Sequence, residues 1–164
     1  MPALALQSPS LVQQKVYNAL KGTNDPSSRH RLWWAAAREF FIQWAASGGN
    51  ANLQFVPYEE TEADAAGGTS LINEWCQIYM FYVKKTGSAT TANTTKVYAD
   101  ATDDTTTTDQ RLSLITSADS QEAMQIYPTG FDMADGVVIT QHTTIEGSTD
   151  GSDGGSGFLV VGAA

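Results

Sequence analysis

EWCQIYMFYVKK, residues 74–85, is the stretch that decides the fold, because it is dense in aromatic and β-branched residues. Alternation along a strand divides its side chains between two faces, with Cys76, Ile78, Met80 and Tyr82 on one and Trp75, Tyr79, Phe81 and Val83 on the other. Both faces are apolar. We therefore expect a central strand here rather than an edge strand.

Shorter β-prone runs surround this strand, and the segments between them are rich in Gly, Asp and Thr. The predicted strands are NLQFV (52–56), TKVYA (95–99), RLSLI (111–115), EAMQIY (122–127), GVVITQHTTIE (136–146) and GFLVVG (157–162). The predicted links include GSATTANT, DATDDTTTT, PTGFDMAD and GSTDGSDGGS. No segment between the strands is long enough for a crossover helix, so antiparallel hairpins and Greek-key crossings in two packed sheets remain.

The N-terminal part carries helix signals instead. Ser10 precedes LVQQKVYNAL as a predicted N-cap, with Val12, Val16 and Leu20 on one stripe, and Gly22 ends this helix. A second helix is predicted from an N-cap at Asp25, with Pro26 in the first turn, to about Ser47. The predicted fold class is α+β: an N-terminal helical hairpin followed by an antiparallel β-sandwich, either jelly-roll or Ig-like.

The second helix has a wide apolar arc, formed by Trp33, Ala37, Phe41 and Trp44 with Leu32, Ala36 and Phe40 beside them. The first helix alone is too narrow to cover it, so we expect the arc to pack on a sheet or on another subunit. Aromatic residues at helical spacing are mostly core residues. The alternatives are a carbohydrate surface and an intersubunit contact, and the candidate interface residues are Trp33, Trp34, Arg38, Phe41 and Trp44.

Three regions follow from these signals: a helical segment over 1–49, a linker with a short strand over 50–70, and a β-sandwich domain over 71–164. Residues 1–47 hold five Lys or Arg against two acidic residues, a net charge of +3, whereas the remainder holds four against sixteen, a net of −12. The acidic bulk argues against a nucleic-acid partner. The start of the chain lacks the cationic region of a secretory signal, and no apolar run approaches the roughly 18 residues of a membrane span, so we expect synthesis in the cytosol and no membrane partner.

Few residues carry recognisable chemistry. The two histidines, His30 and His142, fall in a predicted helix and a predicted strand, and an imidazole metal site needs two or three in register. Cys76 is the single cysteine, which excludes an internal disulfide, and its apolar neighbours predict an inert buried thiol. Nucleophile-elbow, phosphate-loop and dinucleotide motifs are absent from the sequence.

Acidic loops give the remaining candidates. Asp103, Asp104, Glu59 and Glu60 are interpreted as solvated loop charges rather than as acid–base pairs. The Asp150–Gly155 loop offers oxygens to Ca²⁺ but lacks the EF-hand spacing, so a hairpin loop is the preferred interpretation. We expect no catalytic residues, no metal ion and no cofactor, and hence no enzymatic activity.

The last stretch, IYPTGFDMADGVVITQHTTIEGSTDGSDGGSGFLVVGAA, resembles the C-terminal end of small β-sandwich virion proteins encoded by tailed bacteriophages. The matching residues are Pro128, Gly130, Phe131, Gly136, Val137, Val138, Ile139, Thr143, Thr144, Gly157 and Phe158 to Val161. The resemblance covers about half of the chain, from about Trp75, and leaves out the helical segment.

This resemblance implies a non-catalytic structural role on a virion, with capsid decoration or cementing first. The implied partners are the major capsid protein or other virion proteins, together with further copies of the chain, and the implied location is the virion after synthesis in the host cytoplasm. The alternatives are a tail, neck or fibre-attachment component, a glycan-binding β-sandwich module, and a hydrolase whose site the sequence does not reveal.

Overall fold

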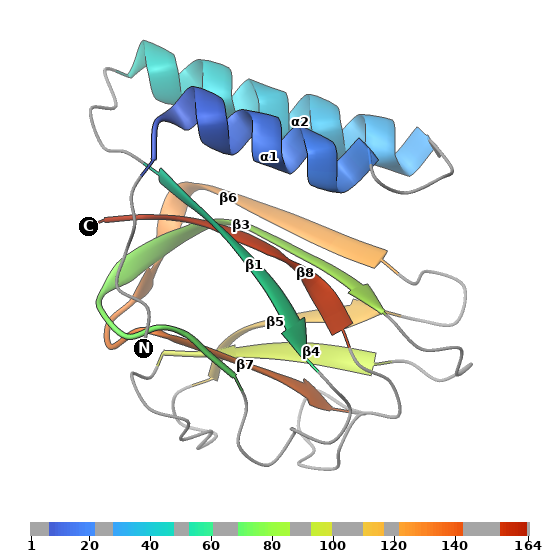
Figure 1. Cartoon of the computed structure of the whole chain (residues 1–164), viewed down its shortest axis with the longest axis vertical. Coiled ribbons are helices and arrows are strands. Elements are labelled where there is room, and N and C mark those ends of the chain that lie inside the picture. The colour runs from blue at the N-terminus through green and yellow to red at the C-terminus, as the bar shows by residue number, and fades with distance from the viewer. Residues whose placement is uncertain are drawn as a thin grey trace.

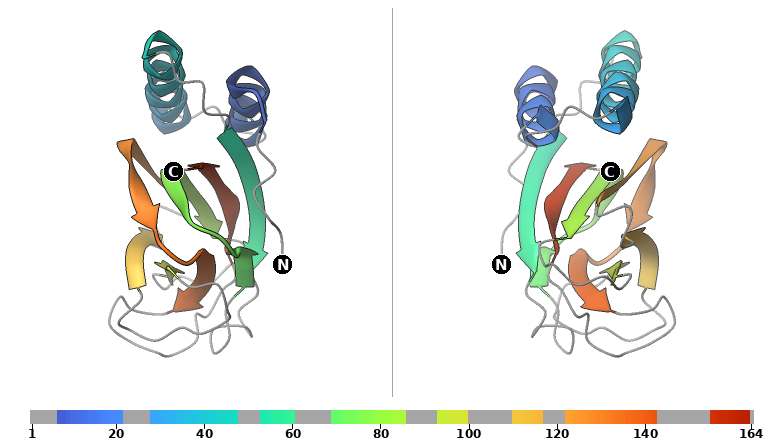
Figure 2. Two further views of the ribbon diagram at one scale, coloured as in Figure 1. Left: turned by 90° about the vertical axis from the view of Figure 1, so that its left-hand side faces the viewer. Right: turned by 90° about the vertical axis from the view of Figure 1, so that its right-hand side faces the viewer.

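The computed structural model describes residues 7–21, 28–47, 53–60, 69–85, 93–99, 110–116, 122–142 and 155–163. Its elements are α1 (Pro9–Lys21), α2 (Ser28–Ala46), β1 (Leu53–Glu60), β2 (Thr69–Ile72), β3 (Cys76–Lys85), β4 (Asn93–Tyr98), β5 (Gln110–Thr116), β6 (Glu122–Met133), β7 (Val137–His142) and β8 (Gly155–Gly162). They form three layers, in which the two helices lie over one sheet and a second sheet lies beneath it (Figures 1 and 2).

The two sheets have the strand orders β1-β8-β3-β6 and β2-β7-β4-β5, and each neighbouring pair is antiparallel. The chain passes from one sheet to the other at every connection except the one between β4 and β5. This eight-stranded double-sheet order is that of a jelly roll. The predicted α+β class with an antiparallel β-sandwich is confirmed, and of the two predicted topologies the strand order is the jelly-roll one.

Two apolar cores hold the layers together. The inter-sheet core includes Ile72, Phe81, Val97, Ile139 and Leu159. The helix–sheet core lies between the helices and the sheet that contains β3, and its buried residues are Val12, Val16, Leu20, Ala37, Phe40, Phe41, Leu53, Tyr79, Met80, Tyr82, Phe158 and Val160. The sheet β1-β8-β3-β6 is therefore covered on both faces.

Strand β3 contributes to both cores and lies between β8 and β6, so the prediction of a central strand is confirmed. The predicted alternation is wrong in part. Cys76 and Ile78 belong to the inter-sheet core, whereas Met80 and Tyr82, which were expected on the same face, belong to the helix–sheet core. The reason is a register shift between Ile78 and Met80, because one extra residue in a strand reverses the faces beyond it.

Helix α1 buries the predicted stripe of Val12, Val16 and Leu20. Its start differs from the prediction: Ser10 lies inside the helix, and the amides of Leu11 and Val12 donate to the carbonyl oxygen of Ser8 at 3.1 and 3.2 Å. Helix α2 ends at Ala46, close to the predicted end, while the predicted caps Asp25 and Pro26 lie outside the described residues. Neither described helix is long and apolar enough to cross a membrane.

The wide apolar arc of α2 packs on the chain's own sheet. Ala37, Phe40 and Phe41 are buried there, and the three tryptophans of α2 pack against the same core. Of the two predicted ways to cover the arc, the sheet is the one observed. The predicted boundary at residue 49 thus divides a core that the helices share with the sheet.

The region predicted as a linker over 50–70 included a short strand at 52–56, and β1 covers that strand. The linker prediction is wrong for the second half of β1, residues 57–60, and for the start of β2, residues 69–70. β1 pairs with β8 along its whole length, from Leu53 opposite Gly162 to Glu60 opposite Gly155. Pro57 and the acidic end of β1 lowered the strand signal. An edge strand tolerates both, because its outer side needs no ladder hydrogen bonds.

Candidate functional site: the Trp44–Tyr79 pocket

A double irregularity in β3 and β6 builds the most distinctive local geometry of the described chain. Ile78 pairs with Phe131, but the next paired residue of β3, Met80, stands opposite Ile126. Residues 127–130 of β6 therefore face the single residue Tyr79. The sequence PTGFDMAD was expected to be a loop, and this prediction is wrong because β6 continues through it to Met133 as a bulged strand.

Two glycines make room for the Tyr79 ring. Gly130 has φ +79°, a conformation that glycine adopts without strain, and a Cβ there would lie 3.0 Å from Tyr79 Cε1. On the other side, a Cβ at Gly162 of β8 would lie 2.9 Å from Tyr79 Cε2. The ring thus occupies space that a side chain at either position would fill.

A chain of hydrogen bonds fixes the Tyr79 hydroxyl. It donates to Gln77 Oε1 at 2.7 Å, and Gln77 Nε2 donates to Asp132 Oδ1 at 2.9 Å. Burial raises the pKa of Tyr79, and the negative charge of Asp132 raises it further. The hydroxyl therefore keeps its proton at neutral pH and acts as a donor.

Helix α2 supplies the opposite wall. The rings of Trp44 and Tyr79 lie edge to face with centroids 4.9 Å apart, and Phe40 contacts both, at 5.6 Å from Trp44 and 5.5 Å from Tyr79. Ser47 Oγ donates to the Trp44 carbonyl oxygen at 2.9 Å and closes the helix end. These aromatic contacts pack the end of α2 against β3.

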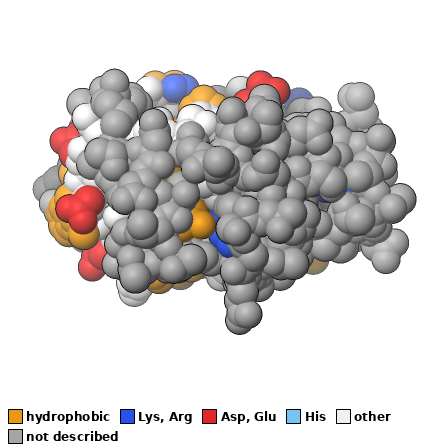
Figure 3. Space-filling view, turned by 90° about the horizontal axis from the view of Figure 1, so that it is seen from below, with side chains coloured by type: hydrophobic (Ala, Val, Ile, Leu, Met, Phe, Trp, Pro, Cys, Tyr) orange, Lys and Arg blue, Asp and Glu red, His pale blue; other side chains and the backbone are white. Residues whose placement is uncertain are grey.

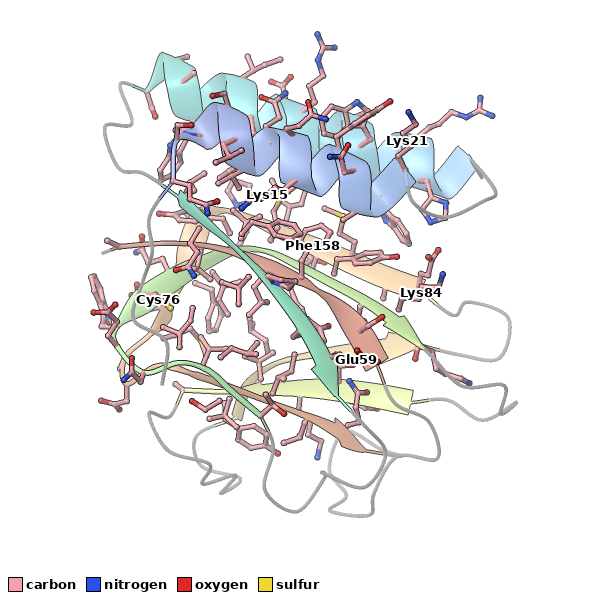
Figure 4. The ribbon with its side chains drawn as sticks, viewed as in Figure 1. Lys15, Lys21, Glu59, Cys76, Lys84 and Phe158 are labelled. Carbon is pink, nitrogen blue, oxygen red and sulfur yellow. The ribbon has the colours of Figure 1, made fainter. Side chains whose placement is uncertain are left out.

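Between these walls lies a cavity of about 260 Å³, which we call the Trp44–Tyr79 pocket. The described residues that line it are Phe40, Gln43, Trp44, Ser47, Tyr79, Pro128 and Thr129. It lies where α2 ends and close to where β3 begins, at the left-hand end of the molecule in Figure 1, and Cys76 marks the start of β3 in Figure 4. The view from below shows the side of the molecule away from the helices, where acidic and apolar side chains lie next to one another at the same left-hand end (Figure 3).

A second hollow of about 390 Å³ lies between α1 and the outer face of β1, β8 and β3, with Asn18, Pro57 and Lys84 among its lining residues. Its floor is a ring stack across three strands, in which Phe158 lies 5.0 Å from Phe55 and 5.2 Å from Tyr82. Figure 4 shows Phe158 beneath the helices and Lys84 near the end of its strand. Phe158 is 1% exposed, so this stack is packing of the core rather than an open platform.

A contact between a histidine and a glutamate joins α2 to β6 near this stack. His30 Nε2 lies 2.6 Å from Glu122 Oε2, and the Tyr82 hydroxyl donates to Glu122 Oε1 at 2.8 Å. His30 also lies edge to face with Trp33 at 5.3 Å. Both side chains are only 11–12% exposed, so the cluster holds the start of α2 against the sheet. Sequence reasoning considered His30 only as a metal ligand and missed this contact.

The five predicted interface residues do not form one patch. Trp33 lies edge to face with Tyr82 at 6.0 Å, Trp34 with Tyr17 of α1 at 4.9 Å, and Phe41 is buried. Arg38 is exposed, and Trp44 alone of the five lines a described pocket. Their predicted role in contacts with other molecules stays a prediction.

The sequence did not single out Tyr79, Gln77, Thr129 or Asp132 as site residues. The available signal was Pro-x-Gly at 128–130, which the resemblance included and which was interpreted as the end of a strand. Inside a β-prone run, such a motif also indicates a bulge.

The other candidates add no second site. Burial raises the pKa of Cys76 to about 12, with a further contribution from Glu74, so the thiol is unreactive at neutral pH. Glu59 is exposed, as expected for a solvated charge. The side chains of His142 and Glu60, and the residues Asp103, Asp104 and 150–154, lie outside what the structure describes.

Within the described ranges, no group of three or more His, Cys, Asp or Glu side chains is arranged to hold a metal ion. Comparison of the chain with protein-family models, with curated proteins and with solved structures gives no match.

Proposed function

We propose that this protein is a non-catalytic structural protein of a virion, and that it decorates or cements the capsid of a tailed bacteriophage. The observation that carries the proposal is the jelly-roll strand order, because double-sheet jelly rolls are used in viral capsid proteins. The stretch that resembles phage virion proteins maps onto the second half of β6, β7 and β8. This support is an analogy of fold and pattern, so the test has to be made on particles.

The helix layer supplies the surface for attachment. Exposed residues recur along α2 at the helical spacing of three and four, as Leu32, Ala35, Glu39, Ile42 and Ala46, and we call this stripe the outer face of α2. Leu32 is 70% exposed and Ile42 49%, and exposed Arg31 and Arg38 flank them. The outer face of α2 is therefore mainly apolar, with one acidic residue, Glu39, at its centre and two arginines beside it, and this combination fits an acidic protein surface such as a capsid lattice.

The copy number of the chain in purified particles tests the proposal. We expect a number close to that of the major capsid protein. A count of a few dozen at most would instead favour the tail, neck or fibre-attachment alternative, and absence from particles would overturn the virion role.

A pair of matched variants tests the attachment surface. Leu32→Ser combined with Ile42→Ser changes only exposed side chains, so the protein should fold normally but fail to join particles that lack it. Trp75→Ser is the control, because Trp75 is 45% exposed and precedes β3, away from the helices in the sequence. Equal incorporation of both variants would show that α2 is not the attachment surface.

Oligomerisation is part of the same proposal, because the exposed apolar side chains of Leu32 and Ile42 also suit contact with a second copy of the chain. Sedimentation of the purified chain over a range of concentrations measures it. We expect self-association that weakens in the Leu32→Ser, Ile42→Ser variant. If the chain is strictly monomeric but still joins particles, the proposal of decoration stands and the proposal of self-association is wrong.

A further inference from the structure

We propose that the Trp44–Tyr79 pocket binds a single ring of a neutral sugar, such as the terminal residue of a glycan. The inference goes beyond the structural role proposed above and does not depend on it. It rests on the size of the pocket, the chemistry of its lining and the irregular backbone that forms it.

The pocket fits one ring. Its volume of about 260 Å³ lies just below the range of roughly 300–1,000 Å³ that holds drug-sized ligands. A pyranose ring is a smaller ligand, whereas an oligosaccharide would extend beyond the cavity into solvent. Recognition would therefore concern one sugar residue, and the affinity of one site would be low.

The lining combines rings with neutral polar groups. Phe40, Trp44 and Tyr79 contribute aromatic surface, while Gln43, Ser47 and Thr129 contribute amide and hydroxyl groups at the exposed rim. A pyranose has the same division, because its C–H bonds form an apolar face and its hydroxyls surround the edge. The C–H face suits the electron-rich face of an aromatic ring, and the hydroxyls suit the rim.

Charge selects against other small ligands. None of the described residues that line the pocket is charged, and the nearby Asp132 and Glu39 are acidic. An anionic ligand would lose hydration without gaining a cationic partner. Gln43 Nε2 and Ser47 Oγ already donate to Glu39 and to the Trp44 carbonyl oxygen, but a purely apolar side chain of a partner protein would offer no hydrogen bond to the Thr129 hydroxyl or to the amide oxygen of Gln43.

The part of β6 that lines the pocket has an irregular backbone, which pairing with β3 at the edge of the sheet does not by itself require. Pro128 and Thr129 reach the rim because β6 bulges opposite Tyr79, and the bulge depends on the positive φ of Gly130. Bulges re-aim side chains and are frequent beside functional sites. In this chain the bulge places a hydroxyl and a proline ring opposite the aromatic wall.

Saturation-transfer NMR on the full chain tests the inference, with the methyl glycosides of glucose, galactose, mannose, N-acetylglucosamine and N-acetylgalactosamine as probes. We expect transfer to the ring C–H protons of at least one of them. Trp44→Ala should reduce this transfer at least tenfold, whereas Trp75→Ala, which removes an exposed tryptophan outside the lining residues, should leave it unchanged.

Two further arms keep the test decisive if Trp44→Ala unfolds the protein. Ser47→Trp adds a ring at the exposed mouth of the pocket, so the fold should persist and binding should be lost. The methyl glycoside of sialic acid and an N-acetylproline amide serve as anionic and apolar probes, and neither should bind. Transfer to the proline probe alone, no transfer to any neutral glycoside, or transfer that survives Ser47→Trp would each overturn the proposal.

A further comparison distinguishes a free monosaccharide from the terminal residue of a glycan as the ligand. It uses the free methyl glycoside and the same residue at the end of an immobilised oligosaccharide. Equal dependence on Trp44 in both arms shows recognition of the ring itself. Binding of the free glycoside with none to the immobilised chain would show a free monosaccharide as the ligand and would overturn the glycan part of the proposal. Copy number on particles is measured separately, so failure here and failure of the virion role are distinguishable.

Discussion

Tyr79 of β3 and Trp44 of α2 lie edge to face with ring centroids 4.9 Å apart, and this contact fastens the end of the helix layer to the sheet. It exists because Tyr79 leaves the alternating pattern of its strand. A regular ladder would have placed Tyr79 on the face opposite Met80 and Tyr82, whereas all three belong to the helix–sheet core. The bulge therefore creates both the contact and the pocket beside it.

Gly130→Ala should destabilise the protein by about 1–3 kcal/mol. A φ of +79° costs a residue with a Cβ about 1–2 kcal/mol, and the new methyl group would press on Tyr79 and Gln77. Urea denaturation followed by far-UV circular dichroism measures the change. Thr129→Ala is the matched control, because it alters the neighbouring exposed residue and should cost less than about 0.5 kcal/mol. Equal midpoints for the two variants would contradict the positive φ of Gly130 and its close approach to Tyr79.

Phe40→Ala should cost about 3–5 kcal/mol of unfolding free energy, because the ring is 6% exposed and packs against both Trp44 and Tyr79. Ile42→Ala, two residues further along the same helix, should cost less than about 1 kcal/mol, since Ile42 is 49% exposed. Guanidinium denaturation of the two variants measures the contrast. If both changes cost the same, α2 does not pack as described.

Deletion of residues 1–47 should yield an insoluble or unfolded chain. The deletion would uncover Met80, Tyr82, Phe158 and Val160 on the outer face of the sheet, and a contiguous apolar surface of this kind promotes aggregation. The boundary predicted at residue 49 implied the opposite, a sandwich that folds alone. Expression of the truncated chain alone and together with a separate 1–47 segment tests this, and we expect soluble protein only when the segment is present. A soluble, cooperatively unfolding truncation would restore the two-part division.

Much of the fold was predictable because its signals are local. The stripe of Val12, Val16 and Leu20 predicts a helix, and the two apolar faces of β3 predict a central strand. The absence of crossover helices in the sequence predicts antiparallel sheets. These inferences use neighbours three, four or two residues apart, which are distances that a sequence shows directly.

The pocket was not predictable, because the contacts that form it join residues far apart in the sequence. The alternation argument assumes an unbroken ladder, and nothing in EWCQIYMFYVKK shows that its partner strand carries extra residues opposite Tyr79. Pro128 and Gly130 indicated a loop, because turn-forming residues interrupt most strands. Here they lie on β6, which is an edge strand among the described residues, and turn-forming residues are tolerated there because the outer side of an edge strand needs no ladder hydrogen bonds. Trp44 was among the predicted interface residues, but its contact partner, Tyr79, lies on a strand of the sheet beneath the helix.

His30 and Glu122 should show a measurable coupling energy. Each is about nine-tenths buried, so His30→Ala leaves the carboxylate of Glu122 with the Tyr82 hydroxyl but without the imidazole and should cost about 1–3 kcal/mol. A double-mutant cycle with Glu122→Ala should give a coupling of about 0.5–3 kcal/mol. The control cycle uses Glu39 and Gln43, an exposed pair on one helix, for which about 0.5 kcal/mol or less is expected. Coupling no larger than in the control would contradict the inference that the His30–Glu122 contact holds α2 against the sheet.

Stability should fall as the pH rises above 9, in part because of Cys76. Burial raises the pKa of its thiol from 9.0 to about 12, so above pH 9 the unfolded chain releases a proton that the folded chain keeps. The unfolded state then binds fewer protons, and the unfolding free energy declines by up to about 1.4 kcal/mol per pH unit from this residue. Urea midpoints between pH 8 and 10.5 should decline less steeply for Cys76→Ala, although its core is weaker at every pH. Parallel declines in the two proteins would show that the thiol titrates alike in the folded and unfolded states.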